Sequence, residues 1–295
     1  FYQKYGGTEL ADSFTDSATY HNIHSVVANG NTHTDTSIKK FGTASGQWDG
    51  SGDYLSVPDS NDWHFGDGDF TIDFWIYRSN PSDDTWDFVI TQPDSTVPSG
   101  QDYFGTYHIG SGTYYIAANG IPGSVGAGSD SFTISEDTWT HIAICQHGDK
   151  IYHYKDGVSV NGVGVGKTST VAWPNYNVPL RIGYQQDVLY YNGYADEIRI
   201  SKGIARFPNG ASFDVATSEY TADKYDVLLL HCNGSNDGTT FTDSSWVGVD
   251  GPSKHTITDV GDVKNVRGAN LDTTYDTFAS FTSTGADTWT CPAGV

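Results

Sequence analysis

The chain has 295 residues, of which 36 are acidic and 15 are basic, so its formal net charge is −21. This charge repels phosphate backbones and the sequence contains no Lys/Arg-rich run, which argues against nucleic-acid binding and against an anionic membrane surface. No run of about 18 apolar residues is present to insert into a bilayer, and 34 glycines with few long charged helix formers favour strands and turns.

A phrase near the start of the chain occurs a second time. Phe14-Thr15-Asp16-Ser17 follows a short apolar run and a glycine, and Phe241-Thr242-Asp243-Ser244 repeats it 227 positions later in a similar context. A repeat of this length indicates a domain period rather than a solenoid repeat. We therefore predict one domain over residues 1–215 and a smaller β-rich module, incomplete or diverged, over residues 216–295.

Alternating apolar and polar residues predict a series of strands. In chain order these are two strands within residues 47–57, then residues 69–77, 139–147, 150–154, 180–183 and 194–200. In the strand at 69–77, Phe70, Ile72, Phe74 and Ile76 fall on one face, which must belong to a core. Short strands separated by turn residues favour an all-β fold, either a two-sheet antiparallel sandwich or a jelly roll.

The order of several phrases resembles the laminin-G-like, concanavalin A-like jelly-roll family. The phrases are FGTASGQWDG at 41–50, DYLSVP at 53–58, DFTIDFW at 69–75, WTHIA at 139–143, YKDG at 154–157, PLRIG at 179–183 and GYADEIRIS at 193–201. The resemblance covers about residues 1–215 and implies two antiparallel sheets packed face to face. The phrase RISKGIARF at 199–207 is similar to such domains in virion proteins, and residues 281–295 resemble the lead-in of glycine-rich modules in phage tail and bacterial surface proteins.

The resemblance also raises the question of catalysis, because this fold occurs in glycoside hydrolases. Such enzymes need two carboxylates about 5–9 Å apart, and the Glu-x-Asp-x-x-Glu phrase that they often carry is absent. Glu197 adjoins Asp196, and neighbours on a regular strand point to opposite faces, so the pair is not expected to flank one glycosidic bond. No Gly-x-Ser-x-Gly elbow occurs either. The sequence therefore predicts a protein that is not an enzyme.

Aspartates in tight loops suggest a metal ion. Short oxygen side chains stand at alternating positions of two tight loops, an arrangement that Ca²⁺ prefers: Asp49, Ser51 and Asp53 in one, and Asp67 and Asp69 in the other. The laminin-G-like resemblance implies another structural Ca²⁺ site that would include Asp16 and Asp196. The alternative is that these side chains satisfy backbone groups of turns. Structural calcium is the one cofactor that the sequence suggests.

Three loops combine aromatic and amide side chains and are candidates for ligand binding. Their candidate residues are Trp86, Tyr103, Tyr107, Trp173, Tyr176, Tyr184, Gln186, Tyr190 and Tyr191. An aromatic ring stacks on the C–H face of a sugar while amides bond its hydroxyls. Tyrosine and tryptophan are also common at protein–protein interfaces and in sandwich cores, so glycan contact, protein contact and a purely structural role all stay open.

Together these features predict a non-enzymatic structural or adhesion module of a virion or extracellular surface assembly. We expect it to contact other copies or other subunits of that assembly and, through its loops, glycans. The alternative is a secreted, lectin-like carbohydrate-binding module, and a glycoside hydrolase ranks below both. The expected location is extracellular or on a virion surface.

Overall fold

The computed structural model describes residues 23–78, 86–92, 103–108, 114–119, 129–168, 172–173, 175–185 and 189–245, and four short strands between residues 259 and 289. Of these residues, side chains are not described for 86–89, 103–108, 114–119, 129–131, 185, 189 and the four short strands. Contacts divide the chain into two compact units: His21–Trp246 is one, and Phe1–Tyr20 with Val247–Val295 is the other. No helix in the described ranges is long and apolar enough to cross a membrane.

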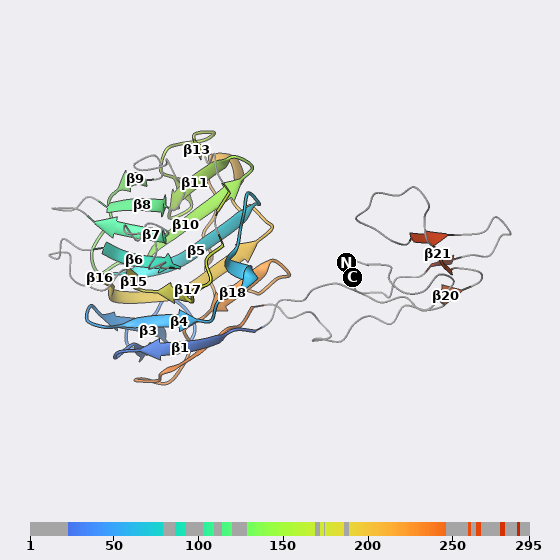
Figure 1. Ribbon diagram of the computed structural model, residues 1–295. Coiled ribbons are helices and arrows are strands. Elements are labelled where there is room, and N and C mark those ends of the chain that lie inside the picture. Colours follow the sequence, from blue (N-terminus) through green and yellow to red (C-terminus); the bar gives the residue numbers. More distant parts are fainter. Residues whose placement is uncertain are drawn as a thin grey trace. The chain divides into compact units, whose positions relative to one another are not determined.

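The larger unit is a sandwich of two antiparallel sheets (Figure 1). One sheet has eight strands in the spatial order β19 (Thr240–Thr242), β1 (Ser25–Asn29), β4 (Tyr54–Val57), β14 (Leu180–Ile182), β6 (Trp86–Thr91), β7 (Tyr103–His108), β8 (Tyr114–Asn119) and β9 (Ser129–Phe132). Its neighbouring strands run antiparallel. This sheet is called the eight-stranded sheet below.

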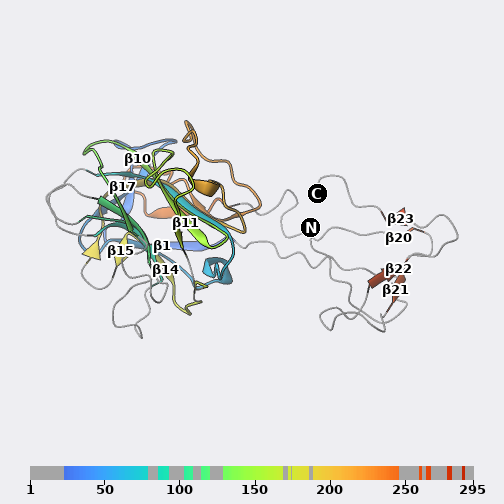
Figure 2. The same ribbon diagram turned by 90° about the horizontal axis from the view of Figure 1, so that it is seen from above.

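The nine-stranded sheet packs against it (Figure 2). Its main order is β12 (Val158–Ser159), β11 (Lys150–Lys155), β10 (Thr140–His147), β5 (Phe70–Tyr77), β17 (Asn192–Lys202), β3 (Ser45–Asp49) and β2 (His33–Asp35), with β13 (Lys167–Thr168) beside β11 and β18 (Asp226–Leu230) beside β17. Two 3-10 turns, η1 (Asn61–Trp63) and η3 (Pro208–Gly210), and the small hairpin of β15 (Tyr184–Gln185) with β16 (Leu189–Tyr190) complete the described part of this unit.

In the smaller unit the structure describes two strand pairs. Strand β20 (Asp259–Val260) pairs with β23 (Thr288–Trp289), and β21 (Lys264–Val266) pairs with β22 (Phe278–Ser280). The prediction of an all-β chain with a two-sheet antiparallel sandwich is confirmed. The predicted boundary at residue 215 stays a prediction, and strands β18 and β19, which follow it, pair with β17 and β1 of the sandwich.

The core lies between the sheets, where period-two alternation brings apolar side chains together. Phe70, Ile72, Phe74 and Ile76 of β5 are between 0% and 2% exposed, as the sequence predicts. They face the buried residues of the eight-stranded sheet, which include Leu55, Val57, Ile90, Leu180 and Ile182. Each such side chain contributes roughly 1.5–3 kcal/mol by leaving water. Burial of this apolar set therefore holds the two layers together.

A turn after β3 carries the chain from one sheet to the other. Strand β3 belongs to the nine-stranded sheet and β4 to the eight-stranded sheet, so the two strands predicted within residues 47–57 do not pair with each other. Asp53 organises the turn: its carboxylate accepts hydrogen bonds from the backbone N–H groups of Asn31, at 2.5 Å, and Asp49, at 2.8 Å.

The second face of β5 is buried as well, which the alternation alone does not predict. Residues 203–225, called the strap here, cross the outer face of the nine-stranded sheet. The Phe207 and Phe213 rings stack at 3.6 Å and contact Tyr154 of β11. The strap fits closely because Gly157 has no side chain: a Cβ there would collide with the carbonyl oxygen of Phe213, and its φ is +76°. Thus this sheet is covered on both faces.

Strand β17 changes partner at a bulge. On one edge it pairs with β3 through residues 192–195 and then with β18 through residues 198–201. Its pairing with β5 shifts between Asp196 and Arg199, and Glu197 has a φ of +50°. A bulge interrupts the regular alternation of side chains. The expectation that Asp196 and Glu197 point to opposite faces of a regular strand therefore does not apply at this position.

Candidate functional site

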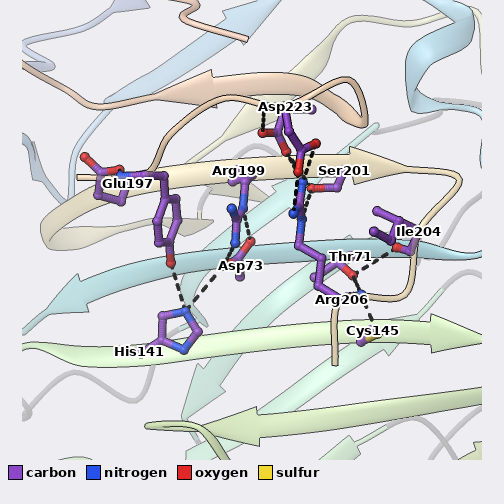
Figure 3. A network of polar contacts seen from close by, with 12 residues as sticks. Thr71, Asp73, His141, Cys145, Glu197, Arg199, Ser201, Ile204, Arg206 and Asp223 are labelled. Atoms are coloured by element: carbon purple, nitrogen blue, oxygen red, sulfur yellow. Dashed lines mark hydrogen bonds and ion pairs between the residues drawn. The ribbon is translucent and has the colours of Figure 1, made fainter. Parts of the chain in front are cut away.

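A polar network occupies the outer face of the nine-stranded sheet, beneath the strap (Figure 3). At its centre Arg199 of β17 donates from Nε to Asp73 Oδ1 at 2.9 Å and from Nη2 to Asp73 Oδ2 at 2.8 Å. The Arg199 guanidinium also lies 4.0 Å from the centroid of the Tyr220 ring. Asp73 is fully buried. This two-pronged ion pair therefore joins two central strands and a residue of the strap.

The charge of Asp73 is stabilised by its partners. Burial acts to raise the pKa of this carboxyl, but the adjacent Arg199 and the hydrogen bond with His141 together hold the pKa well below its usual range. Burial acts to lower the pKa of Arg199, but Asp73 raises it above its ordinary value. Both groups are consequently charged at neutral pH, and each would be costly to leave without the other.

His141 connects this ion pair to the strap. Its Nε2 lies 3.0 Å from the Tyr220 hydroxyl and 3.5 Å from Asp73 Oδ2, and its side chain is 1% exposed. Tyr220 in turn donates its backbone N–H to Glu197 Oε2 at 2.8 Å. Among the described residues, no serine, threonine or cysteine side chain forms a hydrogen bond with His141. The His141–Asp73 contact therefore resembles part of a catalytic triad but has no nucleophile, and it holds the strap in place.

A second arginine fastens the strap nearer to its start. Arg206 donates to both carboxylate oxygens of Asp223 at 2.9 Å and to Asp226 Oδ1 at 2.7 Å. Its backbone N–H donates to Thr71 Oγ1, and its Nε donates to Ser201 Oγ. All of these contacts are within the chain, and they join the strap to strands β5, β17 and β18 of the nine-stranded sheet.

Three titratable side chains beside the β17 bulge are close enough to share a cation. Ligand atoms of Glu197, Glu219 and His231 lie within 4.8 Å of one another. His231 Nδ1 is 2.8 Å from Glu197 Oε1, and this hydrogen bond, opposed by burial, raises the pKa of the imidazole. Glu219 accepts a hydrogen bond from Asn233. Glu197 and His231 are hydrogen-bonded to each other, so a cation bound here would have to displace that bond.

The aspartates predicted as calcium ligands mostly accept N–H donors of the chain itself. Asp196 Oδ2 accepts from the backbone of Lys40 and Phe41, at 2.9 and 3.1 Å, and its Oδ1 accepts from Glu197 N. Burial raises the pKa of Asp196 to about 7. These three donors occupy most of the acceptor sites of the carboxylate and position a loop, so a cation at Asp196 would compete with them.

Two of the other predicted ligands, Asp49 and Asp69, also accept N–H donors of the chain. Asp49 Oδ1 accepts from the backbone N–H of Ser51 at 2.8 Å, which is ordinary turn chemistry. Asp69 accepts from Gly148 N at 2.9 Å and contacts His147 Nδ1 at 3.0 Å. Asp67 is exposed on the turn before β5. Asp16 lies outside the described residues, so calcium binding there stays a prediction.

Of the predicted ligand-binding aromatic residues whose side chains the structure describes, Trp173 and Tyr191 lie apart from the others, in the core. Trp173 and Tyr191 are 4% and 1% exposed and belong to the core, so the prediction that they face a ligand from a loop is wrong. Trp173 donates from Nε1 to Gln146 Oε1 at 2.7 Å, and the Tyr191 hydroxyl donates to the carbonyl oxygens of Tyr77 and Tyr194. Their polar atoms are therefore consumed by internal hydrogen bonds.

The other predicted residues divide into two groups. Trp86, Tyr103 and Tyr107 belong to β6 and β7, where the backbone is described but the side chains are not, and Gln186 lies outside the described residues. Tyr176 is half-buried beside a cavity of about 30 Å³ between the sheets, which Trp63, Trp173 and Gln92 also line. A cavity of that size holds one or two water molecules and is too small for a sugar ring.

Two of the predicted residues, Tyr184 and Tyr190, do meet, and they form an aromatic cluster with a third tyrosine. The Tyr184 ring lies 5.2 Å from Tyr190 and 5.2 Å from Tyr54 of β4, measured between ring centroids. The guanidinium of Arg181 lies over the rings of Tyr54 and Tyr184. Tyr54, Arg181 and Tyr190 are half-buried, while Tyr184 is 5% exposed. We call these four residues the tyrosine–arginine cluster.

Local sequence places the tyrosine–arginine cluster on the outer face of the eight-stranded sheet. Leu55 and Ile182 are opposite each other in register and point into the core, so Tyr54 and Arg181 point outward from β4 and β14. Gly183 then turns the chain into β15 with a φ of +84°, and a Cβ there would lie 2.5 Å from Trp48 Nε1. The outward positions of Tyr54 and Arg181 follow from alternation, but their proximity depends on a strand pairing that the sequence does not reveal.

Comparisons with known proteins agree with this architecture. The family model Laminin_G_3, described as the concanavalin A-like lectin/glucanases superfamily, matches residues 49–205, which is more than half of the chain. No curated protein matches the sequence.

Several solved structures are similar in part. Domain 4 of AbnA, a GH43 extracellular arabinanase from Geobacillus stearothermophilus solved in complex with arabinotriose, has a TM-score of 0.47 at 15% identity, over 66% of this chain and 89% of that chain. The botulinum neurotoxin serotype D binding domain has a TM-score of 0.43 at 11% identity, over 70% of this chain and 47% of that chain. The enzymatically active domain of bacteriophage CBA120 tailspike protein 2 has a TM-score of 0.42 at 10% identity, over 70% of this chain and 34% of that chain.

Proposed function

Because the chain belongs to the concanavalin A-like lectin/glucanases superfamily, we propose that it is a non-enzymatic module that binds a glycan through the tyrosine–arginine cluster. The module acts outside a cell or on a virion surface, as a part of an assembly in which it contacts other copies or subunits. A secreted carbohydrate-binding module is the alternative setting for the same binding site.

This proposal rests on a difference between the outer faces of the two sheets. The strap covers that of the nine-stranded sheet, whereas Tyr54, Arg181 and Tyr190 on that of the eight-stranded sheet are only half-buried. On the nine-stranded sheet the strap buries the polar side chains, including Asp73 and His141 at 0% and 1% exposure. Glycosidic cleavage needs two carboxylates about 5–9 Å apart with the sugar between them. Asp73, Asp196 and Glu197 are buried and hydrogen-bonded within the chain, so none is available to a polysaccharide.

The outer face of the eight-stranded sheet offers a more suitable surface. Half-buried tyrosines present a ring that is apolar on its face and polar at its hydroxyl, which matches the two-sided character of a pyranose. Asn29 is directly opposite Tyr54 in register, so an amide group lies on the neighbouring strand. Among the described residues, the arrangement supplies ring stacking and hydrogen bonding without a pair of reactive acids beside it, which favours binding over cleavage.

A glycan array probed with the full chain tests this proposal. We expect saturable binding to a subset of glycans, and at least a tenfold weaker response from a Tyr54→Ala/Tyr190→Ala double variant. A matched Tyr225→Ala variant, which removes a tyrosine that pairs with Lys224 away from the cluster, should bind as the unmodified chain does. Absence of binding to every glycan, or equal binding by the double variant, would contradict the proposal.

A further inference from the structure

Arginines of the described region differ in what they contact. Arg199 and Arg206 are paired with aspartate carboxylates at 2.7–2.9 Å. The Arg181 guanidinium instead lies 4.8 Å from the Tyr184 ring centroid and 5.3 Å from that of Tyr54. Within the described part of the chain Arg181 has no ion pair and donates no side-chain hydrogen bond.

The guanidinium of Arg181 is placed to bind an anion. Contact with an aromatic face uses the charge of the guanidinium but leaves its N–H groups, which lie in its plane, available as donors. Those donors form a rigid fork that matches the two oxygens of a carboxylate. Because two rings already orient the side chain, a ligand has less conformational freedom to remove on binding.

We propose that the tyrosine–arginine cluster binds an acidic glycan, in which Arg181 receives the carboxylate of a uronic or sialic acid unit and the rings of Tyr54 and Tyr190 pack against the sugar. This inference rests on the proposed glycan-binding function and adds the charge of the ligand. A carboxylate from a second copy of the chain is the alternative occupant, and the outcomes below distinguish it from a glycan.

The test compares acidic glycans with their neutralised counterparts. Oligogalacturonates, hyaluronan fragments and sialyllactose are presented to the full chain beside the methyl esters of the same molecules. We expect at least one acid to bind about tenfold or more tightly than its ester, as a charge-assisted hydrogen bond implies. The preference should weaken with added salt, since the guanidinium is partly exposed.

Variants of Arg181 identify the residue responsible. Arg181→Gln should abolish the preference for the acid over the ester, and Arg181→Lys should retain part of it, since lysine keeps the charge but lacks the fork. Lys224→Gln is the matched control, because Lys224 is also a cation over a tyrosine ring, 5.1 Å from the Tyr225 centroid, and lies outside the cluster. It should leave the preference unchanged, and thermal unfolding of all three variants shows whether each is folded.

The possible outcomes separate this inference from the function on which it rests. Equal binding of acids and esters, unaffected by Arg181→Gln, would overturn the acidic-ligand inference and leave glycan binding intact. Failure of every glycan to bind would overturn both. Self-association of the chain that disappears in Arg181→Gln would identify a protein carboxylate as the occupant and would also overturn the inference.

Discussion

At the residue scale, the buried ion pair of Asp73 and Arg199 is the most consequential contact of the fold. Two hydrogen bonds of 2.8 and 2.9 Å join side chains that are 0% and 10% exposed. An isolated charge left in such a place is strongly destabilising, whereas a well-formed pair roughly offsets its own cost of leaving water. The intact pair therefore adds little to the net free energy of unfolding, but loss of either partner alone is strongly destabilising.

Removal of one partner gives a direct prediction. Asp73→Asn leaves the Arg199 charge without a counterion and should lower the free energy of unfolding by about 3–5 kcal/mol at pH 7, as measured by urea denaturation. Asp223→Asn at the half-exposed end of the network, where the aspartate side chain is 43% exposed, should cost about 1 kcal/mol or less. A loss below that of the control would contradict the assigned role of Asp73.

The stabilisation contributed by the Asp73 carboxylate depends on pH, and its direction follows from the pKa shift. The pKa of Asp73 is held below its usual value in the folded chain, so its stabilising contribution is present above about pH 4, where the unfolded carboxyl is ionised, and is lost as the pH falls further. The difference between the unmodified chain and Asp73→Asn should accordingly shrink in acid. A difference that grows below pH 4 would rule out this explanation.

The residues at the β17 bulge predict the opposite trend near neutrality. The folded pKa of Asp196 is raised by burial to about 7, and that of His231 is raised by its hydrogen bond to Glu197. Both groups bind a proton more tightly in the folded chain than in the unfolded chain. The stability that they add to the folded state is therefore fully present at low pH and is lost as the pH rises through their folded pKa values.

Thermal unfolding between pH 6 and pH 8 checks this trend. The midpoint should fall as the pH rises, and the slope should become shallower in Asp196→Asn and in His231→Gln, because each variant lacks one titrating group. If the midpoint rises over this range, or if neither substitution alters the slope, these two groups do not control the pH dependence of folding.

At the element scale, the strap distinguishes what the sequence can and cannot predict. The alternation of Phe70, Ile72, Phe74 and Ile76 identifies one buried face of β5 from sequence alone, because alternation is local. Burial of Asp73 on the opposite face comes from residues more than a hundred positions away, and these show no regular period. For that reason the sequence predicts the strands of the sheet but not the strap that packs on its outer face.

The residues of the tyrosine–arginine cluster also differ in whether the sequence predicts them. Tyr184 and Tyr190 are found from composition, since aromatic residues stand out in a loop. Arg181 and Tyr54 are not, because their contact depends on the non-local pairing of β14 with β4. Trp173 is a wrong prediction for a related reason: an aromatic residue in a loop is as able to point into the core as out of it, and here its indole donates to Gln146.

Loss of the strap's aromatic contacts should expose the outer sheet face. We expect a Phe207→Ala/Phe213→Ala double variant to accelerate hydrogen exchange in residues 203–225 and in β11, because it removes the stacked rings that cover Tyr154. Val163→Ala, at a residue that is 73% exposed, is the matched truncation and should change neither region. Unchanged exchange in the double variant would show that the rings do not hold the strap.

At the scale of the whole molecule, the chain is heavily acidic, and several of its described carboxylates accept N–H donors of the chain itself. Asp53, Asp69 and Asp196 each accept two or more such donors. Their positions are explained without a cation. Calcium binding through Asp16, which lies outside the described ranges, stays a prediction.

Chelation distinguishes the two explanations for the aspartates. We expect EDTA to change the thermal midpoint of the chain by about 1 °C or less, because hydrogen bonds within the chain position these carboxylates. Equimolar Ca²⁺ added afterwards should have an equally small effect. A drop of several degrees that Ca²⁺ restores would show instead that a calcium ion supports the fold.

The proposed function requires that the molecule bind a glycan and leave it chemically unaltered. The most direct measurement incubates an array-selected oligosaccharide with the chain at equilibrium, measures its binding by calorimetry and then determines its mass after release. We predict saturable binding, an unchanged mass, and at least tenfold weaker binding by Tyr54→Ala/Tyr190→Ala. A shortened oligosaccharide, or full binding by the double variant, would contradict the account.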